Sequence, residues 1–135
     1  MRTIEVDERA GVSLVDVLEA ASSHEVLIVD SLGTWLGNFL ADAEERASRE
    51  PLALAADLDT RAEAVMQALR QCRADAIVVS EETGWGIVPA FALGRIFRDV
   101  LGRMTAAVAG EADRAYLIVA GFAVDLRACG TRIGD

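Results

Sequence analysis

The chain has 135 residues, an apolar content of 53% and a formal net charge of −9. This length suits one domain with a sizeable core. The acidic balance, without a basic stripe interleaved with aromatic residues, argues against nucleic acid as a partner. All 13 basic residues are arginine, so the sequence contains no GxxxxGK[ST] phosphate loop, which needs a lysine.

The sequence shows no membrane or secretion signal and little cysteine chemistry. No apolar run approaches the roughly 20 residues of a membrane span, and the first ten residues lack the layout of a signal peptide. Cys72 and Cys129 are far apart, which favours reduced thiols over a disulfide or a metal site. We therefore expect a cytoplasmic protein.

The first half of the chain alternates between strand and helix patterns. Residues 2–6 could form a short edge strand, and residues 13–21 have helical spacing with Ser13 as N-cap. The apolar run 26–29 predicts a buried strand, and residues 34–46 predict a helix. After a break at 47–51, Thr60 and Glu63 form a capping box for a further helix.

The second half repeats this alternation. Residues 76–79 predict a strand covered on both faces, and Pro89 predicts the start of a helix that continues to about residue 108. Residues 115–120 predict another buried strand, Gly121 a bend, and residues 124–126 a segment that pairs beside it. The whole pattern favours an α/β fold with a parallel sheet covered on both faces, in one domain over 1–127 and a tail over 128–135 without readable pattern.

Asp30 is a candidate binding residue because it directly follows the apolar strand 26–29. In nucleotide-binding α/β proteins, an acid at this place can hold Mg²⁺ or its waters beside phosphates. The alternative is a solvated aspartate that caps the next helix. The pattern alone does not decide between them. His24, the one histidine, has no partner at a spacing that specifies a triad or a metal site.

The loop after strand 76–79 is the second candidate site. It begins with Glu81 and Glu82 and contains Gly84, Trp85 and Gly86, where a parallel strand ends and where open α/β sheets bind ligands. The two glycines would permit backbone geometries that a side chain blocks. Arg98, on the helix that follows, could meet a phosphate, although solvent is its default partner.

Several segments together resemble the bifunctional adenosylcobinamide kinase and adenosylcobinamide-phosphate guanylyltransferase family of cobalamin assembly. The resemblance is collinear and covers residues 2–127. It is carried by these segments: RTIE at 2–5, VLIVDSLGTWLGNFL at 26–40, ETGWGIVP at 82–89, RIFRDVLGRM at 95–104 and AYLIVAGFAVDL at 115–126. Glu81 and Thr105 stand where the family usually has asparagine.

This resemblance implies a P-loop NTPase (RecA-like) three-layer fold with a mostly parallel sheet. Glu5 and Asp30 match family positions that contact the guanine nucleotide, with Asp30 also a ligand for Mg²⁺. The family uses GTP or ATP to phosphorylate adenosylcobinamide, then transfers GMP through a covalent histidine and releases pyrophosphate. Glu82, Gly84, Trp85, Gly86 and Pro89 would shape a pocket or a subunit contact in a homo-oligomer.

Two family elements have no counterpart among these 135 residues. The family's first strand with its P-loop and the segment with the guanylylated histidine are not matched, and His24 does not occupy that histidine's place, so we expect no catalytic residue here. One reading is a portion of the enzyme, inactive alone and completed by a polypeptide carrying the P-loop. The other is a non-catalytic remnant that binds a ligand or oligomerises. A third, an unrelated α/β domain, is disfavoured by the collinear segments.

Overall fold

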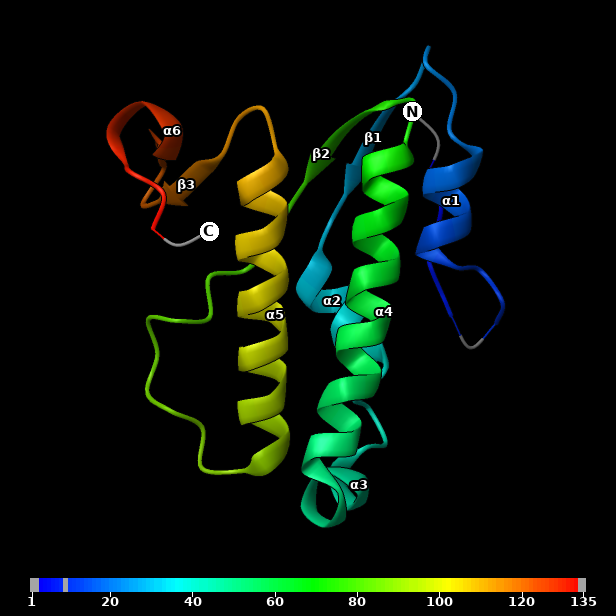
Figure 1. The fold of residues 1–135 in the computed structure, drawn as a ribbon, viewed down its shortest axis with the longest axis vertical. Coiled ribbons are helices and arrows are strands. Elements are labelled where there is room, and N and C mark those ends of the chain that lie inside the picture. Colours follow the sequence, from blue (N-terminus) through cyan, green and yellow to red (C-terminus); the bar gives the residue numbers. More distant parts are fainter. Residues whose placement is uncertain (1–2, 9, 134–135) are drawn as a thin grey trace.

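The computed structural model describes residues 3–8 and 10–133, in which helices and strands alternate along the chain (Figure 1). The elements are α1 (Leu14–Ala20), β1 (Val26–Val29), α2 (Leu32–Asn38), α3 (Glu44–Arg49), α4 (Pro51–Gln71), β2 (Asp75–Val78), α5 (Ala92–Glu111), β3 (Tyr116–Val119), β4 (Phe122–Asp125) and α6 (Leu126–Cys129). The α/β class predicted from the sequence is confirmed.

The four strands form two separate pairs. β1 and β2 are parallel, with Val26 opposite Asp75 and Val29 opposite Val78. β3 and β4 form an antiparallel hairpin, so the predicted pairing beside 115–120 is confirmed. Gly121 makes the bend with a φ of 82°, a conformation that glycine adopts without steric cost.

The core lies among the long helices and on one face of the parallel pair. Its most enclosed side chains come from α1, α2, α4 and α5, and Leu27, Val29 and Val78 pack against them from the strands. The fully buried members are Leu18, Leu32, Leu36, Leu54, Leu58, Val65, Val100 and Leu101. A ring contact between Trp35 and Phe39, with centroids 5.1 Å apart, closes the core beside α2.

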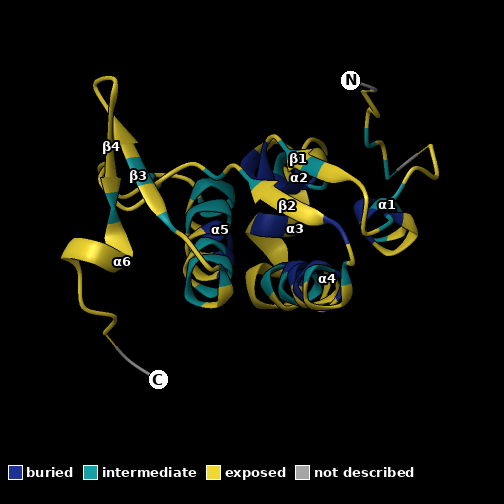
Figure 2. Ribbon diagram, turned by 90° about the horizontal axis from the view of Figure 1, so that it is seen from above, coloured by how far each residue is buried: buried dark blue, intermediate teal, exposed yellow. Residues whose placement is uncertain are grey.

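The prediction that the strands are covered on both faces is wrong for the residues described. Successive strand side chains point to opposite faces, and Val26 and Ile28 are 62% and 61% exposed while Leu27 and Val29 face the core. Figure 2 shows α4 and α5 on one side of the β1–β2 pair and exposed residues along the strands. β3 is likewise exposed rather than buried, with Ile118 67% exposed.

Several element boundaries differ from the predicted ones. Helix 13–21 is confirmed as α1 with Ser13 as its N-cap. The helix expected over 34–46 is divided into α2 and α3. Thr60 caps nothing, because Pro51 at the first turn starts α4 nine residues earlier and the Thr60 hydroxyl donates to the Ala56 carbonyl inside that helix.

Two smaller predictions also change. α5 begins at Ala92 with Phe91 as its N-cap, so Pro89 precedes the helix instead of starting it. An edge strand was expected over residues 2–6. Arg2 lies outside the described residues, and residues 3–6 form no strand. An isolated bridge joins Asp7 to Val12 instead.

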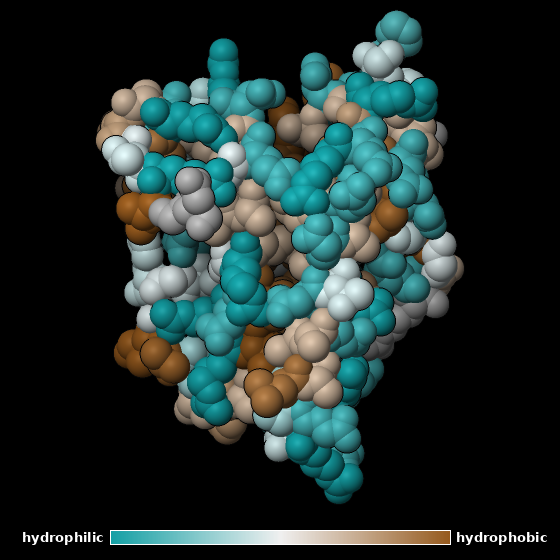
Figure 3. Space-filling view, viewed as in Figure 1, coloured by the Kyte–Doolittle hydropathy of each residue, from teal (hydrophilic) through white to brown (hydrophobic). Residues whose placement is uncertain are grey.

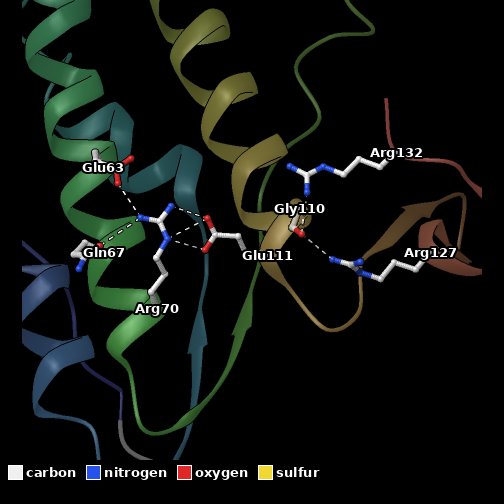
Figure 4. Close-up of polar contacts among 7 residues, drawn as sticks. All are labelled: Glu63, Gln67, Arg70, Gly110, Glu111, Arg127 and Arg132. Atoms are coloured by element: carbon white, nitrogen blue, oxygen red, sulfur yellow. Dashed lines mark hydrogen bonds and ion pairs between the residues drawn. The ribbon is translucent and has the colours of Figure 1, made fainter. Parts of the chain in front are cut away.

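An ion pair fastens the C-terminal ends of α4 and α5 together (Figure 4). The Arg70 guanidinium donates three hydrogen bonds from Nε and Nη2 to the Glu111 carboxylate, the shortest 2.6 Å, and one from Nη1 to Glu63 at 2.8 Å. The Arg70 hydrogen bonds hold the pKa of the Glu111 carboxyl below its usual value. No helix among the described residues is both long and apolar enough to cross a membrane.

Candidate functional site at the carboxyl edge of the parallel strands

The two parallel strands stay side by side beyond their ends, which brings two polar segments together. The Val79 amide donates to the Val29 carbonyl at 2.8 Å, and the Leu32 amide donates to the Val79 carbonyl at 3.0 Å. Asp30 and Ser31 therefore leave β1 next to Ser80 and Glu81, which leave β2. This edge is where open α/β sheets bind ligands.

Glu81 clamps the two segments at this edge. Its carboxylate accepts a hydrogen bond from the Gly33 amide at 3.0 Å and a short one from the Ser31 hydroxyl. Ser31 is 6% exposed and is the N-cap of α2, where its hydroxyl accepts from the Thr34 amide at 3.2 Å. A Cβ at position 33 would overlap the Glu81 carboxylate, so this contact needs the glycine.

Asp30 lies exposed beside this clamp and does not cap the helix. Because Ser31 holds the cap position, the alternative interpretation of Asp30 as the cap of α2 is wrong. Its carboxylate is open to solvent at the strand end, so its assignment as a nucleotide or Mg²⁺ ligand stays a prediction.

Glu5 is not joined to Asp30. It is exposed in an irregular segment, and among the described residues no hydrogen bond or ion pair connects the two. A shallow pocket of about 340 Å³ lies between this segment, α1 and the start of β1, and neither acid lines it. Its lining includes Ile4, Val12, Asp16, Glu25 and Leu27. The two acids thus make no direct contact with each other, and their assignment to the guanine nucleotide stays a prediction.

The loop over 82–91 is tied to α5 by polar contacts. Glu82 accepts from the Gly84 amide at 2.6 Å, and Arg98 Nη2 donates to the Gly84 carbonyl at 3.3 Å. Arg95 Nη1 donates to the carbonyls of Pro89, at 3.0 Å, and Ala90, at 2.7 Å. Arg95 therefore holds this loop against α5, a role that the local sequence pattern does not indicate.

The two loop glycines differ in what a side chain at each would meet. A Cβ on Gly84 would lie 2.7 Å from the Glu82 carboxylate oxygen, whereas one on Gly86 would meet nothing within 4 Å. Neither glycine has a positive φ. The atom near Gly84 is the far end of the flexible Glu82 side chain, which can shift, so the expected steric need for glycine has no support at either position.

The tip of this loop presents apolar side chains to solvent. Trp85 is 70% exposed, Ile87 96%, and Val88 and Phe91 are exposed as well. Hydrophobic side chains protrude at the lower left of Figure 3, where Figure 1 shows the loop beside α5. Such a cluster is typical of an interaction surface.

Glu81 holds this edge together, and the sequence alone assigned it no such role. Its position next to Glu82 in the strand-end loop was noticed, but nothing in the local pattern indicates that it reaches across to residues 31 and 33. Only the parallel register of β1 and β2 brings these positions together.

The donor set at the edge suits a partly hydrated ion better than a protein cage. Among the described residues, no group of three or more His, Cys, Asp or Glu side chains is arranged to hold a metal. Mg²⁺ commonly takes one or two carboxylates together with waters and substrate phosphates. Asp30 fits that role as a single ligand, while the Glu81 carboxylate is engaged by Ser31 and Gly33.

A parallel strand pair with helical crossovers and an acid at its carboxyl edge defines an α/β protein of the kind that binds ligands at strand ends. A family model described as cobinamide kinase / cobinamide phosphate guanyltransferase matches residues 2–126. The chain belongs to this family.

Three curated relatives illustrate the match. The chain is 33% identical over 108 residues to the bifunctional adenosylcobalamin biosynthesis protein CobP of Pseudomonas aeruginosa, covering 79% of this chain and 56% of that protein. The protein CobU of Escherichia coli is 28% identical over 107 residues, covering 77% and 59%. CobU of Salmonella typhimurium is 36% identical over 70 residues, covering 52% and 39%. The chain spans about half the length of the curated relatives it matches.

Proposed function

We propose that this chain supplies the strand-end half of a nucleotide site in an adenosylcobinamide kinase and adenosylcobinamide-phosphate guanylyltransferase. The observation that carries the proposal is Asp30, exposed at the carboxyl edge of β1 beside the Glu81 clamp, in a chain that belongs to this family. The other half, with a phosphate-binding loop and a nucleophilic histidine, comes from family polypeptide outside the matched residues.

Within such an enzyme the edge would bind and orient the nucleotide. Asp30 would hold one position of a Mg²⁺ ion, which when bound neutralises the nucleotide's phosphate charge. Glu81 would keep the two strand ends in register through Ser31 and Gly33. Glu5, exposed in the segment before α1, would contact the guanine nucleotide.

The reaction would have two steps. A nucleoside triphosphate, GTP or ATP, transfers its γ-phosphoryl group to the hydroxyl of adenosylcobinamide. GTP then transfers GMP to a histidine and on to that phosphate, and pyrophosphate leaves. We propose that both steps take place in the cytoplasm. Because this chain has no lysine, both steps need the complementing segment.

Reconstitution tests this proposal. The chain would be co-expressed with the part of the Pseudomonas aeruginosa relative that lies outside its matched 108 residues. We expect GTP to label the complex covalently with GMP, and neither part alone to be labelled. A correctly folded complex that takes no label from GTP would contradict the proposal.

A second function is favoured by the exposed loop over 82–91. A non-catalytic subunit that oligomerises or binds a ligand would use Trp85, Ile87 and Phe91 as contact residues, with Glu82, Gly84, Gly86 and Pro89 shaping the loop. Calorimetry with GTP and with cobinamide separates the two proposals. No heat with either ligand, together with a stable homo-oligomer, would support the second.

A further inference from the structure

Arg98 on α5 is a charged side chain that the fold leaves incompletely satisfied. Its Nη1 atom is buried and has no hydrogen-bond partner among the described residues. Its Nη2 atom donates to the Gly84 carbonyl at 3.3 Å. A buried donor without a partner costs free energy, and it marks a place where a ligand or ion can supply the missing acceptor.

Other arginines of the long helices are neutralised by acids, and Arg98 is not. Arg70 pairs with Glu111 at 2.6 Å, and Arg103, on the same helix as Arg98, pairs with Asp59 at 2.7 Å. Within the part of the chain that the structure describes, no Asp or Glu forms an ion pair with Arg98. Because the chain has 22 acids for 13 arginines, a shortage of acids does not explain this.

The Arg98 side chain lies where the loop over 82–91 leaves the candidate edge. At the end of β2, the Ser80 hydroxyl is 2.6 Å from the Thr105 hydroxyl on α5. Positions 105 and 98 are about two helical turns, or roughly 10 Å, apart along that helix. Thr83 Oγ1 donates to the Arg98 carbonyl at 3.4 Å. The segment that leaves β2 therefore runs along α5 from the edge to Arg98.

A phosphate group has the chemistry to satisfy this guanidinium. Arginine presents its N–H groups in a planar fork that matches two phosphate oxygens. Hydrogen bonds between ions are shorter and about twice as strong as those between neutral groups, so a phosphate would replace the neutral Gly84 carbonyl as acceptor. The loop's own acid Glu82 does not serve here, because it accepts from the Gly84 amide.

We propose that Arg98 is a phosphate-binding residue, which holds one phosphate group through Nη1 and Nη2 where the loop over 82–91 leaves β2. The inference rests on the proposed function for the identity of its ligand, because both proposed steps handle phosphate groups. The phosphate belongs either to the nucleotide or to the phosphorylated corrinoid. Arg98 would add a positive charge to a site at which this chain otherwise presents Asp30 and Glu81.

Titration of the full chain with inorganic phosphate tests Arg98 without the complementing segment. We expect saturable binding by calorimetry and a shift of the Arg98 Nε–H signal in NMR spectra. Arg98→Gln should weaken phosphate binding at least about tenfold, because hydrogen bonds between ions are lost. An unaltered chain that binds no phosphate saturably would overturn the inference.

Arg103→Gln is the matched control, since it removes the same charge from an exposed position on α5. It should bind phosphate as the unaltered chain does. Equal weakening by the two substitutions would show that only the net charge matters, and the inference would be wrong.

Arg98→Lys guards against a variant that does not fold. Lysine keeps the charge and loses the planar fork, so phosphate should bind more weakly than to the unaltered chain. Thermal denaturation shows which variants are folded. If Arg98→Gln is unfolded, Arg98→Lys decides, and unchanged phosphate binding by this variant would overturn the inference.

Kinetics of the reconstituted complex distinguish the two sources of phosphate. Arg98→Gln should raise the KM for GTP if the phosphate is the nucleotide's, and the KM for adenosylcobinamide phosphate if it is the corrinoid's. An unchanged KM for both would count against the inference. Phosphate binding through Arg98 without GTP labelling would keep the phosphate subsite and reject the proposed enzyme. GTP labelling without phosphate binding through Arg98 would do the reverse.

Discussion

Glu81 shows how a single residue organises the candidate site. Its carboxylate joins the end of β2 to the start of α2 through Ser31 and Gly33, and so fixes the backbone next to Asp30. The sequence places Asp30 correctly at the end of a strand. It does not indicate the clamp, because residues 31 and 81 meet only through the pairing of two strands that are 45 or more residues apart.

Replacing Glu81 with alanine should lower the free energy of unfolding by about 1 kcal/mol, because two hydrogen bonds to a carboxylate are lost. Urea denaturation measures this change. Glu82→Ala is the matched control, since Glu82 bonds only to the Gly84 amide in its own loop among the contacts described. Equal effects of the two substitutions would show that the clamp does not stabilise the fold.

Asp30→Asn should change the free energy of unfolding by less than about 0.5 kcal/mol, because the side chain is exposed and Ser31 makes the helix cap. In the complex with the complementing segment, the same substitution should weaken binding of Mg²⁺ and GTP by about tenfold or more. Thermal denaturation and calorimetry measure the two effects. Asp113→Asn, an exposed acid after α5, is the control. A large loss of stability would instead make Asp30 a structural residue.

For the helices, a capping residue next to a helical apolar pattern predicted the start of one helix correctly and of another wrongly. Ser13 caps α1 as predicted, because the cap and the apolar spacing are neighbours in the chain. Thr60 and Glu63 also have the capping spacing, yet α4 runs through them from Pro51. A continuous helix satisfies the backbone groups that a cap would otherwise serve.

The strands show the limit of the same reasoning. The run 26–29 is a strand at the predicted residues, but its burial depends on what lies on its second face. An apolar run indicates that a strand is suited to a covered sheet. The apolar run itself does not indicate which polypeptide covers the second face of the strand.

α1 anchors the amino-terminal half of the described chain through Leu18, which is fully buried against the core. Leu18→Ala should lower the free energy of unfolding by about 2–5 kcal/mol through lost burial and the cavity left behind. Chemical denaturation measures it. Leu52→Ala, at an 85% exposed position on α4, should cost far less. Equal losses would mean that α1 does not pack as described.

The ion pair between α4 and α5 predicts a pH dependence. Because Arg70 lowers the pKa of Glu111 in the folded chain, the pair stabilises the fold above the carboxyl's ordinary pKa. This stabilisation is lost as the pH falls through the lowered pKa. Glu111→Gln should therefore lower the melting temperature slightly at pH 7, and the difference from the unaltered chain should shrink in acid.

The control for this prediction is Glu45→Gln, which removes an exposed acid paired with Arg49 within α3. It should not reproduce the effect on the α4–α5 contact. A Glu111→Gln difference that stays constant from pH 7 into acid would contradict the assigned role of the ion pair.

In the whole molecule, the exposed strand faces and the acid at the strand edge lie on the same parallel strand pair. The described residues hold a core, a parallel strand pair and the polar edge with Asp30, while the sheet is interrupted beside β2. Because the chain belongs to the family, we propose a nucleotide site at this edge. The phosphate-binding loop would then come from family polypeptide outside the matched residues.

The most direct test is a map of the GTP footprint on the reconstituted complex. Hydrogen exchange would be measured with and without GTP and Mg²⁺. We expect added protection at residues 30–34 and 80–84, which contain Asp30 and the Glu81 clamp, and its loss in Asp30→Asn. Bound GTP that leaves these two segments unchanged would contradict the claim that this edge forms half of the nucleotide site.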